Sequence, residues 1–170
     1  ASVAEARLPL SDPYAPVSFV DTAGCGFNEE QEPKYKSRFN PGEFNILREH
    51  LYQLLQLFGE EPVPPIGIIS PYREQVRYMK EHIAEDARLA GLPLTIDTID
   101  AFQGQEREII YISLVRSNTH LEIGFLKDYR RMNVAMTRAR KKLVIIGDSA
   151  TIGDDPFYKS FLEYCEKNGH

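Results

Sequence analysis

Cysteine, long apolar runs and positive charge are all scarce in this 170-residue chain, and each shortage excludes a class of protein. The two cysteines, Cys25 and Cys165, lie far apart in the sequence, so neither a disulfide framework nor a cysteine-based metal site is expected. No apolar stretch approaches the roughly 20 residues that a membrane-spanning helix needs, and no signal peptide is recognisable. These features predict a cytoplasmic protein in a reducing compartment, without a membrane partner.

The formal net charge of −5 means that the chain as a whole does not attract nucleic acid electrostatically. Any polyanionic ligand must therefore be bound by a local cluster of cations. Residues 1–16 carry three prolines and no periodicity, so we expect an extended lead-in there and a single domain over residues 17–170. Because the chain starts at Ala1 rather than at Met, we expect a fragment of a longer protein.

Short apolar runs alternate with amphipathic segments, in the order β-α-β-α-β-β-α-β-α. The strand-like runs are continuously apolar, which is typical of a parallel sheet covered on both faces. The alternation predicts an α/β fold, a three-layer α/β/α sandwich with a mainly parallel sheet. The expected strands cover residues 17–20, 66–69, 94–99, 108–115 and 142–147, the expected helices cover residues 40–58, 70–90, 129–139 and 155 onward, and a charged loop is expected over residues 28–39.

The first of these helices has a recognisable start. Asn40 suits the N-cap, Pro41 the first helical position and Glu43 the third position, where its side chain can close a capping box. Gly59 marks the expected end of the same helix.

In doubly wound sheets, ligands sit at the carboxyl ends of the strands. The residues expected at those ends include Asp21, Ser70, the segment 98–106 and Asp148. The tetrapeptide DTAG at residues 21–24 is like the switch element of GTPases and suggests a small nucleotide-binding switch. However, no GxxxxGK[ST] phosphate loop accompanies it, so a chance match in the polar turn after a strand is favoured.

The stretch 95–148 holds a cationic cluster that could bind phosphate. Arg131 and Arg138 are seven residues apart, which is two helical turns, so we expect them to share one helix face. Arginine suits planar, bidentate contacts with phosphate. A solvated basic face is the alternative interpretation, favoured for the lysines but not for Arg138. The cluster consists of Arg130, Arg131, Arg138, Arg140, Lys141 and Lys142.

A polar loop at residues 100–106 directly follows an expected strand of the same stretch. Gly104 permits a tight backbone, and Gln103 and Glu106 offer an amide and a carboxylate beside it. On spacing alone, a hydrogen-bonded turn and a binding loop are equally good interpretations.

Three motifs in combination resemble motifs IV, V and VI of superfamily 1 helicases, most closely those of the Upf-like group. They are ISPYREQ at residues 69–75, TIDAFQGQE at 98–106 and YRRMNVAMTRARKKLVIIGD at 129–148. The similarity covers roughly residues 17–150. It implies the second RecA-like domain, of the P-loop NTPase-type fold, in an ATP-dependent DNA or RNA helicase.

The resemblance also implies the partners of such a domain. ATP would bind between it and a first RecA-like domain, which would supply the phosphate loop and hold Mg²⁺. The chain has neither a GKT or GKS sequence nor a DEAx box, so it should not hydrolyse ATP alone.

Residue by residue, the resemblance implies a nucleotide site. Arg138 matches the arginine finger, a catalytic group that neutralises charge on the γ-phosphate as the phosphoryl group leaves. Gln103, Gly104 and Glu106 match motif V at the nucleotide cleft, and Arg131 matches an arginine that supports the finger or bridges to the sheet. Arg138 and the loop should therefore converge on one edge of the sheet and face open space.

The resemblance implies a nucleic-acid site as well. Ser70 and Thr98 match positions that touch the backbone of single-stranded DNA or RNA, a contact that positions the strand without reading its sequence. Tyr72 matches motif IV, and both stacking on a base and simple packing are open for it. A stand-alone nucleic-acid-binding or regulatory module, with the fold but without motor activity, is the alternative function. The choice between DNA and RNA is also open.

Overall fold

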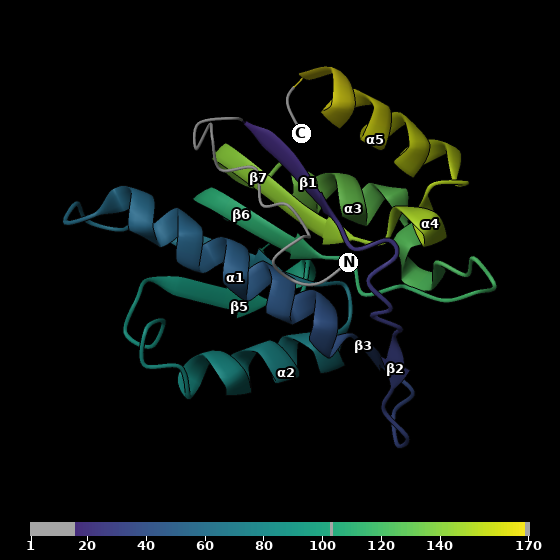
Figure 1. Ribbon diagram of the computed structural model, residues 1–170, viewed down its shortest axis with the longest axis horizontal. Helices are drawn as coiled ribbons and strands as arrows, with labels where there is room; N and C mark the ends of the chain where they lie inside the picture. Colours follow the sequence, from purple (N-terminus) through teal and green to yellow (C-terminus); the bar gives the residue numbers. More distant parts are fainter. Residues whose placement is uncertain (1–15, 103, 169–170) are drawn as a thin grey trace.

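The computed structural model describes residues 16–102 and 104–168, which form a three-layer α/β/α sandwich around one parallel sheet. The five strands lie in the order β1-β7-β6-β4-β5, and every pairing between neighbours is parallel (Figure 1). This confirms the predicted fold class. The strands are β1 (Val17–Asp21), β4 (Ile66–Ile69), β5 (Leu94–Asp97), β6 (Arg107–Ser113) and β7 (Ala139–Gly147).

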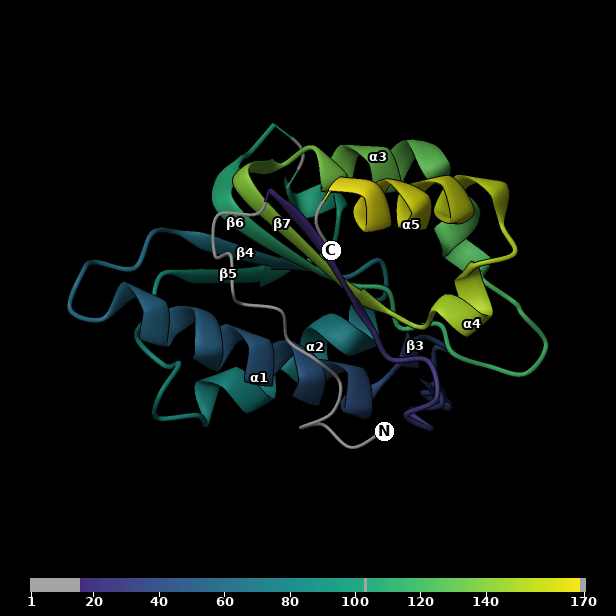
Figure 2. The same cartoon turned by 45° about the horizontal axis from the view of Figure 1, so that its top comes forward.

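The helices divide between the two faces of the sheet. Figure 2 shows α1 and α2 on one face and α3, α4 and α5 on the other. Each face has its own apolar core: Leu47 and Met79 pack on the first face, whereas Phe102 and Met132 pack on the second. The helices are α1 (Pro41–Phe58), α2 (Arg73–Ala84), α3 (Tyr129–Met136), α4 (Ser149–Ile152) and α5 (Pro156–Asn168), with short 3₁₀ helices η2 (Asp100–Phe102) and η3 (Gly124–Lys127).

The segment predicted as a charged loop contains a small β-hairpin. Its strands, β2 (Glu30–Gln31) and β3 (Arg38–Phe39), pair antiparallel, and the hairpin projects beyond the sheet beside the start of α2 (Figure 1). Two-residue strands with little burial carry no alternating pattern, so the sequence could not reveal them. Tertiary contacts hold the hairpin instead, among them an ion pair of Arg38 with Glu29 at 2.8 Å.

At the start of α1, the predicted N-cap is present but the predicted capping box is not. The Asn40 side chain caps the helix by accepting a hydrogen bond from the Glu43 N–H at 3.0 Å. The capping box is wrong, because Glu43 does not return to the Asn40 N–H. That N–H donates to Gln75 at 2.9 Å, and the fully buried Glu43 carboxylate points toward β6 instead, where Ser113 donates to it at 2.6 Å.

Three further expectations from the sequence concern the cysteines, membrane-spanning helices and the lead-in. Cys25 and Cys165 are both free thiols. Among the helices in the described ranges, none is long and apolar enough to cross a membrane. The expected lead-in over residues 1–16 lies outside the described residues except for Pro16, whose carbonyl accepts from the Leu143 N–H at 2.8 Å.

Candidate functional site

The candidate residues fall into two groups at opposite ends of the strands. Ser70 follows β4 and Thr98 follows β5, at the carboxyl ends, whereas Glu106 precedes β6 and Arg138 precedes β7, at the amino ends. The prediction that the whole segment 98–106 lies at the carboxyl ends is therefore wrong. Because β5 and β6 are parallel, the loop between them must travel from one edge of the sheet to the other.

Arg138 lies at the junction of α3 and β7. Its half-buried side chain is held by its own chain: Nε donates to the Val134 carbonyl at 3.2 Å and Nη2 to the Thr137 hydroxyl at 3.3 Å. Within the described ranges, no carboxylate oxygen lies within 4.0 Å of its guanidinium. The Arg138 charge is thus fixed in position and has no carboxylate partner among the described residues, which suits an incoming anion.

The loop after β5 meets Arg138 through the backbone. The Arg107 N–H donates to the Arg138 carbonyl at 3.0 Å, so Glu106 and Arg138 lie at one edge of the sheet, as expected. Gly104 is exposed and adopts a φ of 73°, the left-handed conformation that glycine takes most easily. The Glu106 carboxylate pairs with Arg140 at 3.2 Å. Gln103 lies outside the described residues.

Arg131 does not belong to this group. The helix α3 ends at Met136, so Arg138 lies beyond it and the prediction of a shared helix face is wrong. The Arg131 side chain is exposed at the far end of α3, where it pairs with Asp100 at 3.6 Å and with Asp128 at 3.5 Å. Exposed pairs of this length contribute little to stability.

A groove of about 1030 Å³ opens at the carboxyl ends of β4 and β5. Thr98 and Arg131 line it, together with Tyr72, the first turn of α2, the tip of the β2–β3 hairpin and η3. The structure thus gathers three of the proposed ligand-binding residues in one concave site, in the position where open α/β sheets bind ligands. Its lining residues are Glu32, Tyr35, Lys36, Ser37, Pro71, Tyr72, Arg73, Glu74, Arg77, Thr98, Ile99, Asp100, Phe125, Asp128 and Arg131.

Two candidates at this edge are almost fully buried, although Tyr72 contributes part of the groove wall. Ser70 is fully buried, and its hydroxyl accepts from the Tyr72 N–H at 3.3 Å. The Tyr72 ring is 3% exposed and its hydroxyl contacts the Ile123 carbonyl and Arg116 Nη1, so packing is the arrangement observed. Burial raises the pKa of the Tyr72 phenol, which keeps it neutral.

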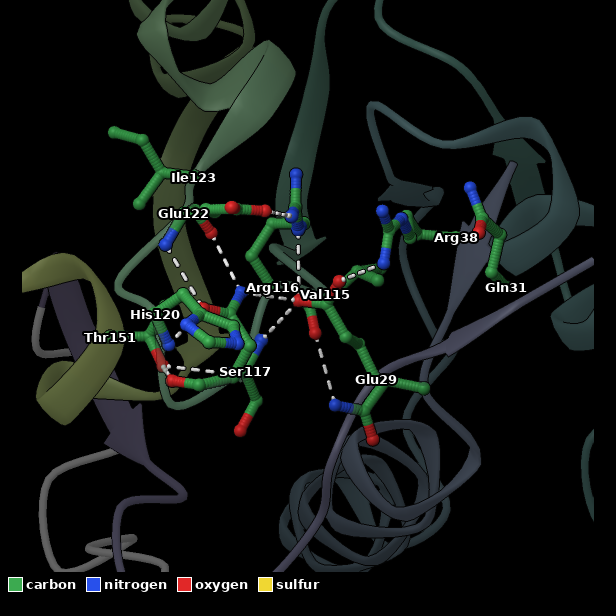
Figure 3. Close-up of polar contacts among 12 residues, drawn as sticks. Glu29, Gln31, Arg38, Val115, Arg116, Ser117, His120, Glu122, Ile123 and Thr151 are labelled. Carbon is green, nitrogen blue, oxygen red and sulfur yellow. Dashed lines mark hydrogen bonds and ion pairs between the residues drawn. The ribbon is translucent and has the colours of Figure 1, made fainter. Parts of the chain in front are cut away.

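The sequence analysis did not single out Glu29, whose carboxylate connects elements on two sides of the groove. Its carboxylate accepts from Arg116 Nε at 2.8 Å, from the Ser117 N–H at 2.9 Å and from the Asn118 amide at 2.8 Å (Figure 3). It also pairs with Arg38 of β3, so one carboxylate joins the hairpin to the segment after β6. In the sequence, Glu29 is one acidic residue of a charged loop, and this does not indicate which residues its carboxylate contacts.

The same segment carries a strained residue. Val115 adopts a φ of 73°, which is unfavourable for a β-branched side chain, and it is fully buried. Its backbone is held from both sides, since its N–H donates to Glu43 at 2.7 Å and its carbonyl accepts from Asn40 at 3.0 Å. Burial raises the pKa of the Glu43 carboxyl to about 8.

Hydrogen bonds to the Asp21 side chain stabilise the turn at residues 21–24. The Asp21 carboxylate accepts from the Ala23 N–H at 2.9 Å and from the Ser149 N–H at 3.0 Å, so it joins the end of β1 to α4. This is a polar turn after a strand, the interpretation favoured over a GTPase switch. Among the described residues, no group of three or more His, Cys, Asp or Glu side chains could hold a metal ion.

Comparison with known proteins shows which protein family the chain is similar to. A family model described as an AAA domain matches residues 2–150. The DNA polymerase alpha-associated DNA helicase A of Saccharomyces cerevisiae is 40% identical over 161 residues, which cover 92% of this chain and 23% of the yeast protein. The putative helicase MOV-10 of Gallus gallus is 40% identical over 162 residues, covering 85% of this chain and 17% of that protein.

The DNA-binding protein SMUBP-2 of Rattus norvegicus is similar as well, with 36% identity over 154 residues, or 91% of this chain and 15% of the rat protein. The chain thus spans less than a quarter of the length of each of these three relatives. The similarity extends over nearly all of the sandwich, including both edges of the sheet.

Proposed function

Since this chain belongs to the AAA-domain family that forms the C-terminal domain of Upf-like superfamily 1 helicases, we propose that it is the second motor domain of an ATP-dependent helicase. Its two edges then have separate tasks. The amino edge, with Arg138 and Glu106, faces the nucleotide, and the carboxyl edge, with the groove, holds single-stranded nucleic acid.

The observation that carries this proposal is the guanidinium of Arg138, which forms no ion pair with any residue that the structure describes. In phosphoryl transfer, negative charge spreads over the departing γ-phosphoryl group, and a guanidinium positioned there lowers the barrier, with rate effects on the order of 10³–10⁵. The bonds from Arg138 to Val134 and Thr137 fix the side chain without neutralising it. The site is pre-organised, so little reorganisation is needed when the substrate arrives.

ATP is the substrate in this proposal, and the chain contributes only part of its site. A first RecA-like domain would contribute the phosphate loop and the residues that hold Mg²⁺. Closure of the two domains on ATP would bring Arg138 to the γ-phosphate, and hydrolysis would release them. Arg131 lies in the groove near the start of α3, and Arg138 follows two residues after its end, so α3 connects the two sites.

A substitution at Arg138 tests the proposal in a full-length protein that contains this chain. We expect Arg138→Ala to reduce ATP turnover stimulated by nucleic acid at least about a thousandfold. Arg138→Lys should also be slow, since a lysine cannot reproduce the planar fork. Arg88→Ala is the matched control, because Arg88 is an exposed arginine that stacks on Tyr52 on the opposite face of the sheet.

Unchanged ATP turnover in Arg138→Ala, with the fold intact by circular dichroism, would exclude Arg138 as the arginine finger and remove the main support for the proposal. Absence of ATP turnover in the unmodified full-length protein, combined with preserved binding of single-stranded nucleic acid, would favour the regulatory module that keeps the fold alone. Parallel titrations with DNA and RNA strands decide which nucleic acid the protein prefers.

A further inference from the structure

Two large aromatic side chains are exposed in the groove, although aromatic rings usually favour burial. Tyr35, at the tip of the β2–β3 hairpin, is 75% exposed, and Phe125, in η3, is 67% exposed. They come from segments 90 residues apart in the sequence and line the same concave surface. Exposed aromatic rings gathered in one groove are a common feature of binding sites.

The backbone of the hairpin tip is built to hold Tyr35 outward. The Glu32 carboxylate accepts from the Lys34 N–H at 2.7 Å and from the Tyr35 N–H at 2.6 Å, and these bonds lower the pKa of Glu32. Lys36 adopts a φ of 63°, and its N–H donates to the Glu32 carbonyl at 3.0 Å. A left-handed lysine is unfavourable, and such strain is often found at functional sites.

The hairpin is fastened to the sandwich at its base. The Ser37 hydroxyl accepts from the Glu74 N–H at 3.2 Å in the first turn of α2, and Arg38 pairs with the buried Glu29. The position of Tyr35 therefore depends on the framework of the groove and not only on the loop itself.

Phe125 is mounted on the same framework. Its ring lies against that of Tyr72, with 5.5 Å between the ring centroids and an angle of 35° between the planes. Tyr72 in turn accepts from Arg116 at 3.2 Å, and Arg116 pairs with Glu29 (Figure 3 shows Arg116 and Glu29). Both aromatic rings thus connect through Glu29.

Four cations and four carboxylates line the groove, and two of the cations make no ion pair within the described ranges. Arg77 pairs with Glu74, and Arg131 pairs with Asp100 and Asp128. The side chains of Arg73 and Lys36 have no ion pair or hydrogen bond within the described ranges, and both are exposed. A groove with exposed aromatic rings and available cations matches single-stranded nucleic acid, whose bases stack on rings and whose phosphates meet cations.

We propose that Tyr35 and Phe125 are base-stacking residues for single-stranded nucleic acid, and that Arg73 and Lys36 contact its phosphates. The inference rests on the proposed function and adds to it the side chains that contact the bases. It replaces Tyr72 as the stacking candidate, because Tyr72 is buried beneath Phe125. Stacking is independent of base identity, since every base has an aromatic face, and this suits a protein that moves along a strand.

The test compares two labelled strands by fluorescence anisotropy, using the 170-residue chain at low salt. One strand is a thymidine oligomer of about 12 nucleotides, and the other is an abasic oligomer of equal length and charge. We expect the unmodified chain to bind the base-containing strand about tenfold more tightly or better. The double variant Tyr35→Ala/Phe125→Ala should bind both strands equally.

Control variants separate stacking from folding. Tyr35→Phe and Phe125→Tyr keep the rings and should keep the preference, as should Tyr164→Ala, which removes an aromatic side chain, 51% exposed, from α5. If the double variant still prefers the base-containing strand, the stacking proposal is wrong while the motor function stands. Equal binding of both strands by the unmodified chain also overturns stacking. Binding of neither strand overturns both the stacking and the strand-binding part of the proposed function.

Discussion

The Arg107 N–H donates a hydrogen bond to the Arg138 carbonyl at 3.0 Å, and this bond joins two segments that are both proposed to contact the nucleotide. It lies where β6 and β7 begin to pair, just before a register shift between Arg107 and Ile109. Arg107 also stacks its guanidinium over the Phe102 ring, with 5.5 Å to the centroid. The position of Arg138 is thus coupled to the loop at residues 100–106 and to the core beneath it.

Gly104 in this loop should resist substitution by any ordinary residue. A Cβ at Gly104 would meet no atom of the described residues within 4 Å, so the expected cost comes from its φ of 73°. We expect Gly104→Ala to lower the free energy of unfolding by about 1 kcal/mol, measured by chemical denaturation.

The matched variant Gly104→Asn separates conformation from contact. Asparagine tolerates the left-handed region better than alanine, so its cost should be smaller. Equal losses in the two variants would contradict the conformational explanation.

Glu43 makes the stability of the fold depend on pH. Its folded pKa of about 8 lies above the ordinary value of 4.5, so the folded state binds more protons than the unfolded state between these values. Its contribution is complete below pH 4.5 and is lost as the pH rises toward 8, with a slope of up to about 1.4 kcal/mol per pH unit. Urea denaturation between pH 6.5 and pH 8 measures the loss.

This range avoids the opposite effect of a buried histidine. Burial lowers the pKa of His50 from 6.5 to about 4, so its contribution grows with pH only below pH 6.5. Glu43→Gln should flatten the profile above pH 6.5, because the amide resembles the protonated acid and its oxygen can still accept from Ser113. A slope that is unchanged in Glu43→Gln would assign the pH dependence to another group.

The Glu29 carboxylate should contribute far more to the free energy of unfolding than the exposed ion pairs do. Its side chain and that of Arg116 are only 4% and 6% exposed, and removal of the carboxylate leaves a buried guanidinium without its main partner. We expect Glu29→Ala to cost about 3–5 kcal/mol, measured by thermal or chemical unfolding.

The control is Lys141→Ala, which breaks a 3.6 Å pair with Glu108 in which the lysine is 73% exposed. It should change stability by less than about 0.5 kcal/mol. Comparable losses in the two variants would show that the network around Glu29 has no special role.

The sequence was sufficient for the sandwich and insufficient for the site, for physical reasons that particular residues illustrate. Continuous apolar runs such as 66–69 and 143–146 require burial on both faces, which fixes a parallel sheet between helix layers. At DTAG the expected polar turn after a strand is present, and the Asp21 carboxylate accepts from the Ala23 N–H two residues on. Such short-range patterns are readable from spacing alone.

Long-range pairings are not readable in this way. Glu43 has the spacing of a capping box, yet Ser113 and Val115, about 70 residues away, take its carboxylate. Lys142 fits a solvated basic face by sequence, but it is 3% exposed because β7 is covered where Lys142 lies. Arg131 and Arg138 have helical spacing, but α3 ends between them. In each instance a tertiary contact or a helix end decides where the side chain lies.

Gly67 of β4 packs against Phe102, which belongs to the loop at the candidate site. A substitution at Gly67 therefore tests whether the core and the site are coupled. A Cβ at Gly67 would lie 2.6 Å from Ile110 Cδ1 and 2.8 Å from Phe102 Cε1, so both of these packed side chains must give way. We expect Gly67→Ala to cost about 1–3 kcal/mol in the free energy of unfolding. Because Phe102 belongs to the loop that reaches Arg138, the variant should also slow ATP turnover in the full-length protein.

A double variant identifies which neighbour transmits the strain. Phe102→Leu removes the ring atom nearest to the new Cβ, so Gly67→Ala/Phe102→Leu should be more stable than the sum of the two single changes predicts. The difference from additivity, measured by a double-mutant cycle of chemical denaturation, should be about 1 kcal/mol or more. Strict additivity would place the strain on Ile110 instead. The amino edge would then be insensitive to Gly67, and ATP turnover in Gly67→Ala should match that of the unmodified protein.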